Sequence, residues 1–175
     1  MPRMPLLDES AAPISAEALA TIKHWRGGTL LPIDRLTIHS EAVALGWIQM
    51  FAGLAAHCTI GIRIREIVLL RVGVLTHARY ELYHHGRIAQ AKAGMTDAEI
   101  GAVADWRSAA CFSEKELAVL AYTDAMTENV QVPDAVFEAL RAHFRDSEIV
   151  ELTANIAGYN MVCRFMEALE LLPEA

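Results

Sequence analysis

One stretch, residues 63–75, constrains the fold of this chain more than any other. Its apolar residues Ile64, Ile67 and Val68 follow the three- and four-residue spacing of an α-helix, which predicts a helix with a buried face. Glu66 lies within this apolar run, where a lone carboxylate costs free energy unless a partner binds it. The pattern therefore predicts a buried carboxylate and requires a partner for it elsewhere in the chain.

The other helices are predicted from their start and stop signals. Thr96 with Glu99, and Ser113 with Glu116, have the spacing of a capping box, in which two side chains satisfy free amides at a helix start. Gly94 suits the end of a helix because glycine readily adopts the left-handed conformation. No alternation of apolar and polar residues predicts a strand, so we expect an all-α fold. The expected helices cover residues 15–24, 40–57, 63–75, 77–94, 96–105, 113–128, 133–144 and 147–171, with a loop at 30–37.

Composition limits the partners and the compartment. The chain has 175 residues, of which 54% are apolar, and its net charge of −7 argues against a nucleic-acid partner. The longest apolar stretch, residues 42–56, is interrupted by Gln49 and is shorter than the roughly 20 residues of a membrane span. Residues 1–9 lack the apolar run of a secretory signal. Three widely spaced cysteines, Cys58, Cys111 and Cys163, fit a reducing cytosol, so we expect a cytoplasmic protein with no membrane partner.

The second chemical feature is the pair Glu81 and His85, four residues apart and therefore on one helix face. A neighbouring carboxylate raises the pKa of an imidazole, and we expect this to poise His85 near neutrality for acid–base work. A simpler reading is that Glu81 and His85 form a solvated surface pair, and that Glu66 is an exposed charge paired with Arg63 or with Arg71. His77, four residues before Glu81, offers a third zinc ligand, but zinc sites usually draw on several elements, so we expect no metal.

These residues also match a known family pattern. The segments Arg65-Glu66-Ile67-Val68-x-Leu70-Arg71 and Tyr80-Glu81-x-x-His84-His85 together resemble the carboxymuconolactone decarboxylase family, which includes the AhpD-type alkylhydroperoxidases. The family pattern has a glutamate, eleven residues, C-x-x-C, three residues and a histidine. Counted from Glu66, the cysteine positions fall on Ala78 and Glu81, and the histidine position falls on His85. The chain resembles a member that lacks both cysteines.

The resemblance implies a particular architecture. The expected fold is an AhpD-like helical bundle with two related helical halves. The five-residue pattern at 66–70 recurs at 148–152, which fits such halves, although five matched residues could also be chance. Residues 1–14 are expected to form an extended N-terminal arm, and residues 15–175 a single carboxymuconolactone decarboxylase-like domain. Relatives form trimers or hexamers, so we expect a homotrimer or homohexamer.

The resemblance also implies a reaction. We expect a cofactor-independent decarboxylase acting on a small carboxylated or lactone substrate, with no metal. His85 would carry the proton, Glu81 would be its partner or the acid itself, and Glu66 would orient them. The expected substrate-binding residues are Arg71, His84 and Tyr80, because an arginine can bind a carboxylate through two hydrogen bonds.

Two alternatives stay open. The first is AhpD-like alkylhydroperoxidase or peroxiredoxin activity, which the family favours and the missing C-x-x-C opposes, because the dithiol cycle needs a resolving cysteine. The second is a non-catalytic helical oligomer that binds a small molecule. Separated or exposed side chains at Glu66, Glu81 and His85 would favour this second alternative over both enzymes.

Overall fold

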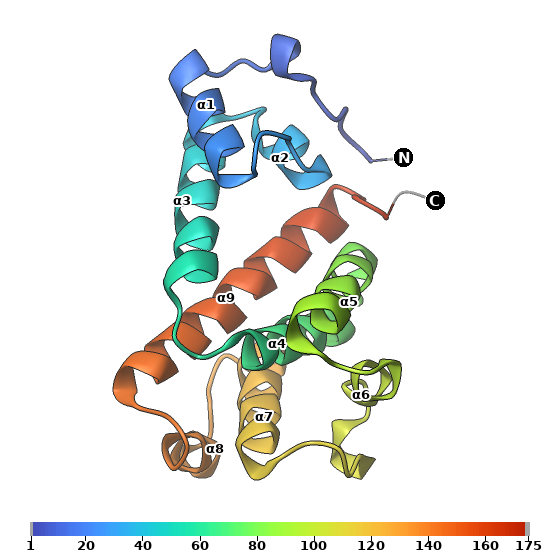
Figure 1. Cartoon of the computed structure of the whole chain (residues 1–175), viewed down its shortest axis with the longest axis vertical. Coiled ribbons are helices and arrows are strands. Elements are labelled where there is room, and N and C mark those ends of the chain that lie inside the picture. The colour runs from blue at the N-terminus through green and yellow to red at the C-terminus, as the bar shows by residue number, and fades with distance from the viewer. Residues whose placement is uncertain (1, 174–175) are drawn as a thin grey trace. The chain divides into compact units, whose positions relative to one another are not determined.

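The computed structural model describes residues 2–173, and over that range the chain is all-α, as predicted. It contains nine α-helices and two short 3-10 helices, and the described residues include no strand (Figure 1). None of the helices within 2–173 is long and apolar enough to cross a membrane. The chain forms two compact units. Among the described residues, one comprises residues 2–58 with Ala168–Leu172, and the other comprises Thr59–Glu167 with Pro173.

The first unit is built on α3 (Glu41–His57), against which α1 (Ala16–Trp25) and α2 (Pro32–Thr37) pack. Its core is an apolar cluster from α1, α3 and the residue that follows α2, against which residues of the N-terminal segment and Leu30 pack. Ser15 caps α1 as expected, because its hydroxyl accepts the amide hydrogen of Ala18. The core residues are Ile22, Ile38, Ala44, Ile48 and Ala52, with Leu7, Ala12, Ile14 and Leu30 against them.

The expected loop at residues 30–37 is wrong, because α2 occupies most of it. Pro32 lies at the helix start, where its missing amide hydrogen costs nothing, and Asp34 accepts the amide hydrogen of Leu31 at 2.9 Å. Arg26 also binds the Asp34 carboxylate through two nitrogens. These contacts stabilise a six-residue helix that is too short to show a helical period in sequence.

The N-terminal segment is held along the first unit. It contains a short 3-10 helix, η1 (Glu9–Ala11), and its Leu7 amide donates to the carbonyl oxygen of Arg35 at 3.0 Å. The Arg35 side chain donates in turn to the carbonyl oxygens of Leu6 and Leu7. The single domain expected over residues 15–175 stays a prediction.

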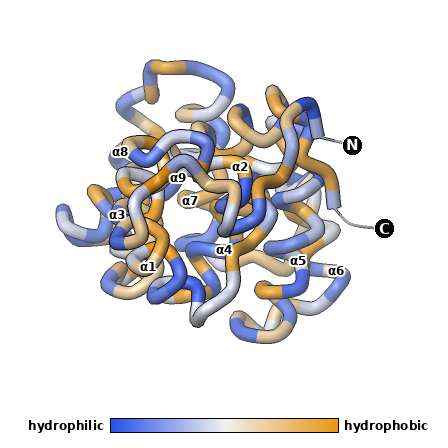
Figure 2. Tube along the Cα trace, turned by 90° about the horizontal axis from the view of Figure 1, so that it is seen from above, coloured by the Kyte–Doolittle hydropathy of each residue, from blue (hydrophilic) through white to orange (hydrophobic). Residues whose placement is uncertain are grey.

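The second unit is centred on α4 (Ile62–Leu75), which packs against α5 (Arg79–Ala93) and α7 (Glu114–Glu128). It also contains α6 (Asp97–Ala102), η2 (Trp106–Ser108), α8 (Asp134–Arg141) and most of α9 (Asp146–Ala168). Apolar and polar residues alternate in short stretches along the helices in Figure 2, as expected when each helix has one buried face.

Both predicted capping boxes form, and one arginine joins them. One carboxylate oxygen of Glu99 accepts the backbone amide hydrogen at the start of α6, and Glu116 does the same for α7. The other oxygen of each glutamate binds Arg63 of α4, at 2.7 Å for Glu99 and 2.6 Å for Glu116. Helix α6 ends at Ala102, earlier than the expected 105. The arginine thus links the starts of two helices to the central helix, which no capping pattern predicts.

Candidate functional site

The site depends on the close packing of α4 against α5. Gly73 allows this approach, because a Cβ atom there would lie only 3.1 Å from Cδ2 of Leu82. Three residues connect the helices, and His77 among them has a left-handed φ of 56°. The tight connection places the α5 side chains at 81 and 85 beside the α4 side chain at 66.

Glu66 and His85 meet inside the second unit. Nδ1 of His85 lies 2.7 Å from Oε2 of Glu66, and the Glu66 side chain is fully buried. The other Glu66 oxygen, Oε1, accepts from Nε and Nη2 of Arg65 at 3.3 and 3.2 Å. The partner that the sequence required for the buried carboxylate is therefore His85, with Arg65 on the far oxygen.

Glu81 lies on the opposite edge of the His85 ring. Nε2 of His85 is 3.0 Å from Oε2 of Glu81, one helical turn away. This contact brings opposite charges together, but Oε2 of Glu81 is buried and makes no well-aligned hydrogen bond. Of the three side chains, Glu66 is therefore fully engaged, whereas Glu81 keeps hydrogen-bonding capacity for another group.

The two carboxylates determine the charge of His85. Burial alone lowers the pKa of His85, but the hydrogen bonds and charges of Glu66 and Glu81 outweigh burial and raise that pKa to about 9. The expectation that His85 is poised near neutrality is therefore wrong. The sequence argument counted one carboxylate, whereas two flank the ring, so the imidazole is protonated at neutral pH.

Aromatic rings surround the histidine. Tyr159 of α9 meets the His85 ring edge-on, with ring centroids 5.5 Å apart. His84 also lies edge-on to His85 at 5.5 Å, and Tyr80 stacks on His84 at 6.0 Å. The predicted residues Tyr80 and His84 thus lie beside the cluster. The sequence analysis missed Tyr159, because only the tertiary fold brings α9 to this place.

Arg71, which was predicted to bind substrate, points to a different side of α4 from Glu66. It lies five residues after Glu66, about 140° around the helix. Its guanidinium binds Asp124 at 2.5 Å and the carbonyl oxygens of Val103 and Ala104. The residue is 5% exposed, and its partners Asp124 and Val103 are buried as well. The prediction that Arg71 binds substrate is therefore not supported, because its hydrogen bonds hold α4 to α7 and to the end of α6.

The cysteines do not form a reactive pair at this site. Ala78 and Glu81 occupy the positions at which the family pattern has cysteines, and both are buried. Cys163 is buried on α9, and burial, opposed by a hydrogen bond with Thr76, raises the pKa of its thiol to about 12. A thiol with so high a pKa is a poor nucleophile at neutral pH.

A metal site at this place is not supported either. Within residues 2–173, no group of three or more His, Cys, Asp or Glu side chains is arranged to hold a metal ion. His77 precedes the first residue of α5 and is exposed, so the stripe of His77, Glu81 and His85 does not form on one helix.

The second copy of the repeated pattern carries no such cluster. Glu148, which corresponds to Glu66, lies in the first turn of α9 and pairs with Arg145 at 3.1 Å. The buried acid–base residues that we identify therefore belong to the first copy.

Comparisons with known proteins agree with this pattern. Residues 41–125 match the model of the carboxymuconolactone decarboxylase family. The chain is 30% identical over 109 residues to YnjA of Escherichia coli (strain K12), described as uncharacterized. That match covers 62% of this chain and 59% of YnjA, so the chain matches less than two thirds of its relative's length.

Solved structures with the same fold are more distant in sequence. An uncharacterized peroxidase-related protein from Ralstonia eutropha JMP134, with an AhpD core, has a TM-score of 0.84 and 18% identity, over 99% of this chain and 92% of that one. A candidate AhpD antioxidant defence protein from Agrobacterium tumefaciens has a TM-score of 0.73 and 24% identity, over 78% and 94%. The debrominase Bmp8 has a TM-score of 0.77 and 17% identity, over 97% and 90%. Residues 41–125 thus match the carboxymuconolactone decarboxylase family model, and the fold of the chain is AhpD-like.

Proposed function

We propose that this protein is a cofactor-independent decarboxylase of the carboxymuconolactone decarboxylase type, acting on a small carboxylated lactone. One observation carries the proposal. His85 lies between two carboxylates, at 2.7 Å from Glu66 and 3.0 Å from Glu81, and has a pKa of about 9. At neutral pH the pair of His85 and Glu81 therefore holds one proton that it can donate.

That proton has two positions. It can stay on Nε2 of His85, or it can cross to Oε2 of Glu81, an atom 3.0 Å from Nε2 that has no hydrogen-bond partner among the described residues. Glu66 binds Nδ1 in both cases and so fixes the ring orientation. We assign Glu81 as the group that passes the proton to the substrate, His85 as its proton reservoir and Glu66 as the residue that positions the ring.

The reaction follows from these roles. The carbon–carbon bond to the substrate carboxylate breaks, CO₂ leaves, and the bonding electron pair stays on the substrate as a carbanion. Glu81, which carries the proton that came from Nε2 of His85, protonates that carbon. Water then supplies a proton to Nε2 of His85, so the site is restored without a cofactor. A positioned general acid typically accelerates such a step by about 10²–10⁴-fold.

The alternatives fit the site less well. A dithiol peroxidase cycle needs two cysteines, whereas Ala78 and Glu81 stand at the matching positions and the Cys163 thiol has a pKa of about 12. We therefore do not extend the peroxidase activity suggested by the names of structural relatives to this protein. Burying a protonated histidine between two carboxylates costs desolvation free energy. The non-catalytic alternative assigns no role to this cluster.

The proposal is tested with purified protein and carboxymuconolactone, by following CO₂ release and by incorporation of deuterium from D₂O into the product. We expect turnover that falls about 10²–10⁴-fold in both variants, because His85→Ala removes the transferable proton and Glu81→Gln removes the group that passes it to the substrate. Glu66→Gln should keep the shape of the site and lose most of the rate.

Matched controls come from the exposed surface of α8 and the turn after it. His143→Ala and Glu138→Gln make the same changes at exposed positions and should keep the wild-type rate. Because the donor must be protonated, the rate should be steady below neutrality and fall as pH rises through about 9. Wild-type turnover in His85→Ala would remove His85 from the mechanism.

A further inference from the structure

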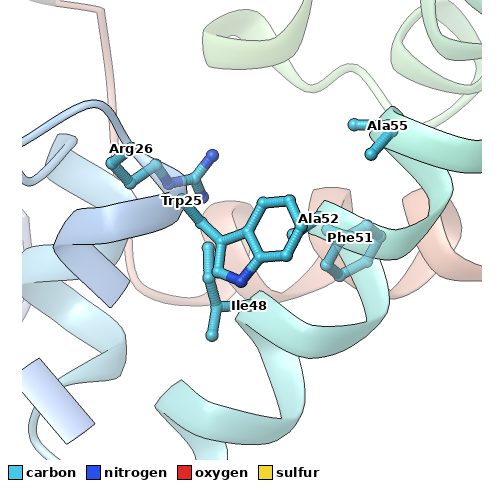
Figure 3. A pocket seen from close by; sticks show the side chains of 7 residues that line it. Trp25, Arg26, Ile48, Phe51, Ala52 and Ala55 are labelled. Carbon is cyan, nitrogen blue, oxygen red and sulfur yellow. The ribbon is translucent and has the colours of Figure 1, made fainter. Parts of the chain in front are cut away.

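A second candidate site lies entirely within the first unit. A pocket of about 220 Å³ opens between the end of α1 and the second half of α3. Figure 3 shows Trp25, at the end of α1, beside the side chains of Ile48, Phe51 and Ala52 on α3. Arg26 and Ala55 lie on either side of this group. The cluster of Glu66, Glu81 and His85 belongs to the second unit, so this pocket is not part of the proposed active site.

The walls of the pocket are aromatic and aliphatic. The Trp25 side chain and the Phe51 ring form two sides, and small alanines along α3 leave room between them. Trp25 is 45% exposed, so a large share of the indole surface stays available for a ligand to cover. A cavity of about 150 Å³ is enough for benzene, and pockets for drug-sized ligands begin near 300 Å³, so this pocket suits one aromatic ring with a small substituent.

One polar group distinguishes the pocket from a bare apolar surface. Asp34 binds Arg26 side-on, through Nε at 2.9 Å and Nη2 at 2.9 Å. The remaining nitrogen, Nη1, makes no hydrogen bond to any residue in the range 2–173. A guanidinium can bind a second carboxylate through its unused N–H groups, and buried or half-buried polar groups gain from such a partner.

We propose that this pocket binds a small aromatic carboxylate, with the ring against Trp25 and Phe51 and the carboxylate on Nη1 of Arg26. The carboxylate on Arg26 accounts for the unused donor, and the planar ring accounts for the aromatic walls and the volume. The site is independent of the proposed decarboxylase activity.

The test is a calorimetric or NMR titration of the full chain with benzoate. We expect saturable binding with a Kd on the order of millimolar or tighter, as the size of such a ligand allows. Benzamide has the same ring without the charge and should bind at least about fivefold more weakly, since charge-assisted hydrogen bonds are the stronger ones. Equal affinity for the two probes would overturn the carboxylate assignment.

Two variants locate the site. Ala56→Phe places a ring into the pocket from an exposed position and should raise the Kd at least about tenfold, while Ala42→Phe makes the same change on α3 outside the pocket and should leave it unchanged. Trp25→Ala should weaken binding about threefold or more through lost ring contact. His85→Ala should bind benzoate as the wild type does, which separates this site from the active site. No saturable binding, or equal affinity in Ala56→Phe and Ala42→Phe, would overturn the proposal.

Discussion

Two buried charged clusters share the helix α4, and they differ in how completely their polar atoms are satisfied. In one, Arg71 binds Asp124 at 2.5 Å and donates to two carbonyl oxygens. Asp124 in turn accepts from Nε1 of Trp106 at 3.1 Å and lies 3.0 Å from Nη2 of Arg107. In the other, His85 contacts Glu66 and Glu81, but Oε2 of Glu81 has no well-aligned hydrogen bond.

The difference separates a structural role from a chemical one. A buried ion pair that leaves no buried side-chain atom without a partner, as with Arg71 and Asp124, holds helices together, and removing one partner is strongly destabilising. A buried group with unused hydrogen-bonding capacity costs stability and is available to a substrate. The chain thus uses residues only five positions apart on α4 for different purposes.

The largest effect on stability is expected in the structural cluster. Asp124→Ala leaves Arg71 as an uncompensated buried charge and should lower the free energy of unfolding by about 3–5 kcal/mol. Denaturant unfolding followed by circular dichroism measures this change. The matched control is Asp146→Ala, at a side chain that is 90% exposed, which should cost below about 1 kcal/mol. An equally small loss in both variants would mean that the Arg71 cluster does not stabilise the fold.

The chemical cluster should appear as a pH dependence of stability. His85 has a folded-state pKa of about 9, above its ordinary value of 6.5. Its contribution should therefore be fully present below pH about 6.5 and be lost as pH rises through about 9, by about 2–4 kcal/mol in total. Unfolding free energies measured from pH 6 to 10 test this for the wild type and for His85→Gln. Parallel curves for the two proteins would contradict it.

The smallest effect concerns access to the chemical cluster. Burial raises the pKa of the Cys163 thiol to about 12, and the negative charge of the nearby Glu81 carboxylate also raises it. Iodoacetamide at neutral pH should therefore modify the exposed Cys111 much faster than Cys163. Mass spectrometry of timed samples gives the order. Rapid alkylation of Cys163 in the folded protein would show that this side of the cluster is open to reagents.

The sequence predicts local features of the site and misses those that depend on long-range contacts. The helix spacing predicts that Glu81 and His85 share a face, and the apolar run indicates that Glu66 needs a partner, whereas the meeting of Glu66 with the other two was expected from the family resemblance. The pairing of Arg71 with Asp124 joins residues 53 positions apart, and no local pattern reveals it. For the same reason the sequence misses Tyr159, and it mistakes the short helix α2 for a loop because the contacts of Asp34 with Arg26 are invisible to periodicity.

The most direct measurement is the titration of His85 itself. Nuclear magnetic resonance of protein labelled at its seven histidines, with His85→Gln used to assign the signal, follows the ring between pH 5 and 10. We predict that His85 titrates near pH 9 and that Glu81→Gln moves this midpoint downward, because one of the two carboxylates that favour the imidazolium is then neutral. A His85 midpoint near the ordinary 6.5, unchanged in Glu81→Gln, would contradict the protonated relay on which the proposed function rests.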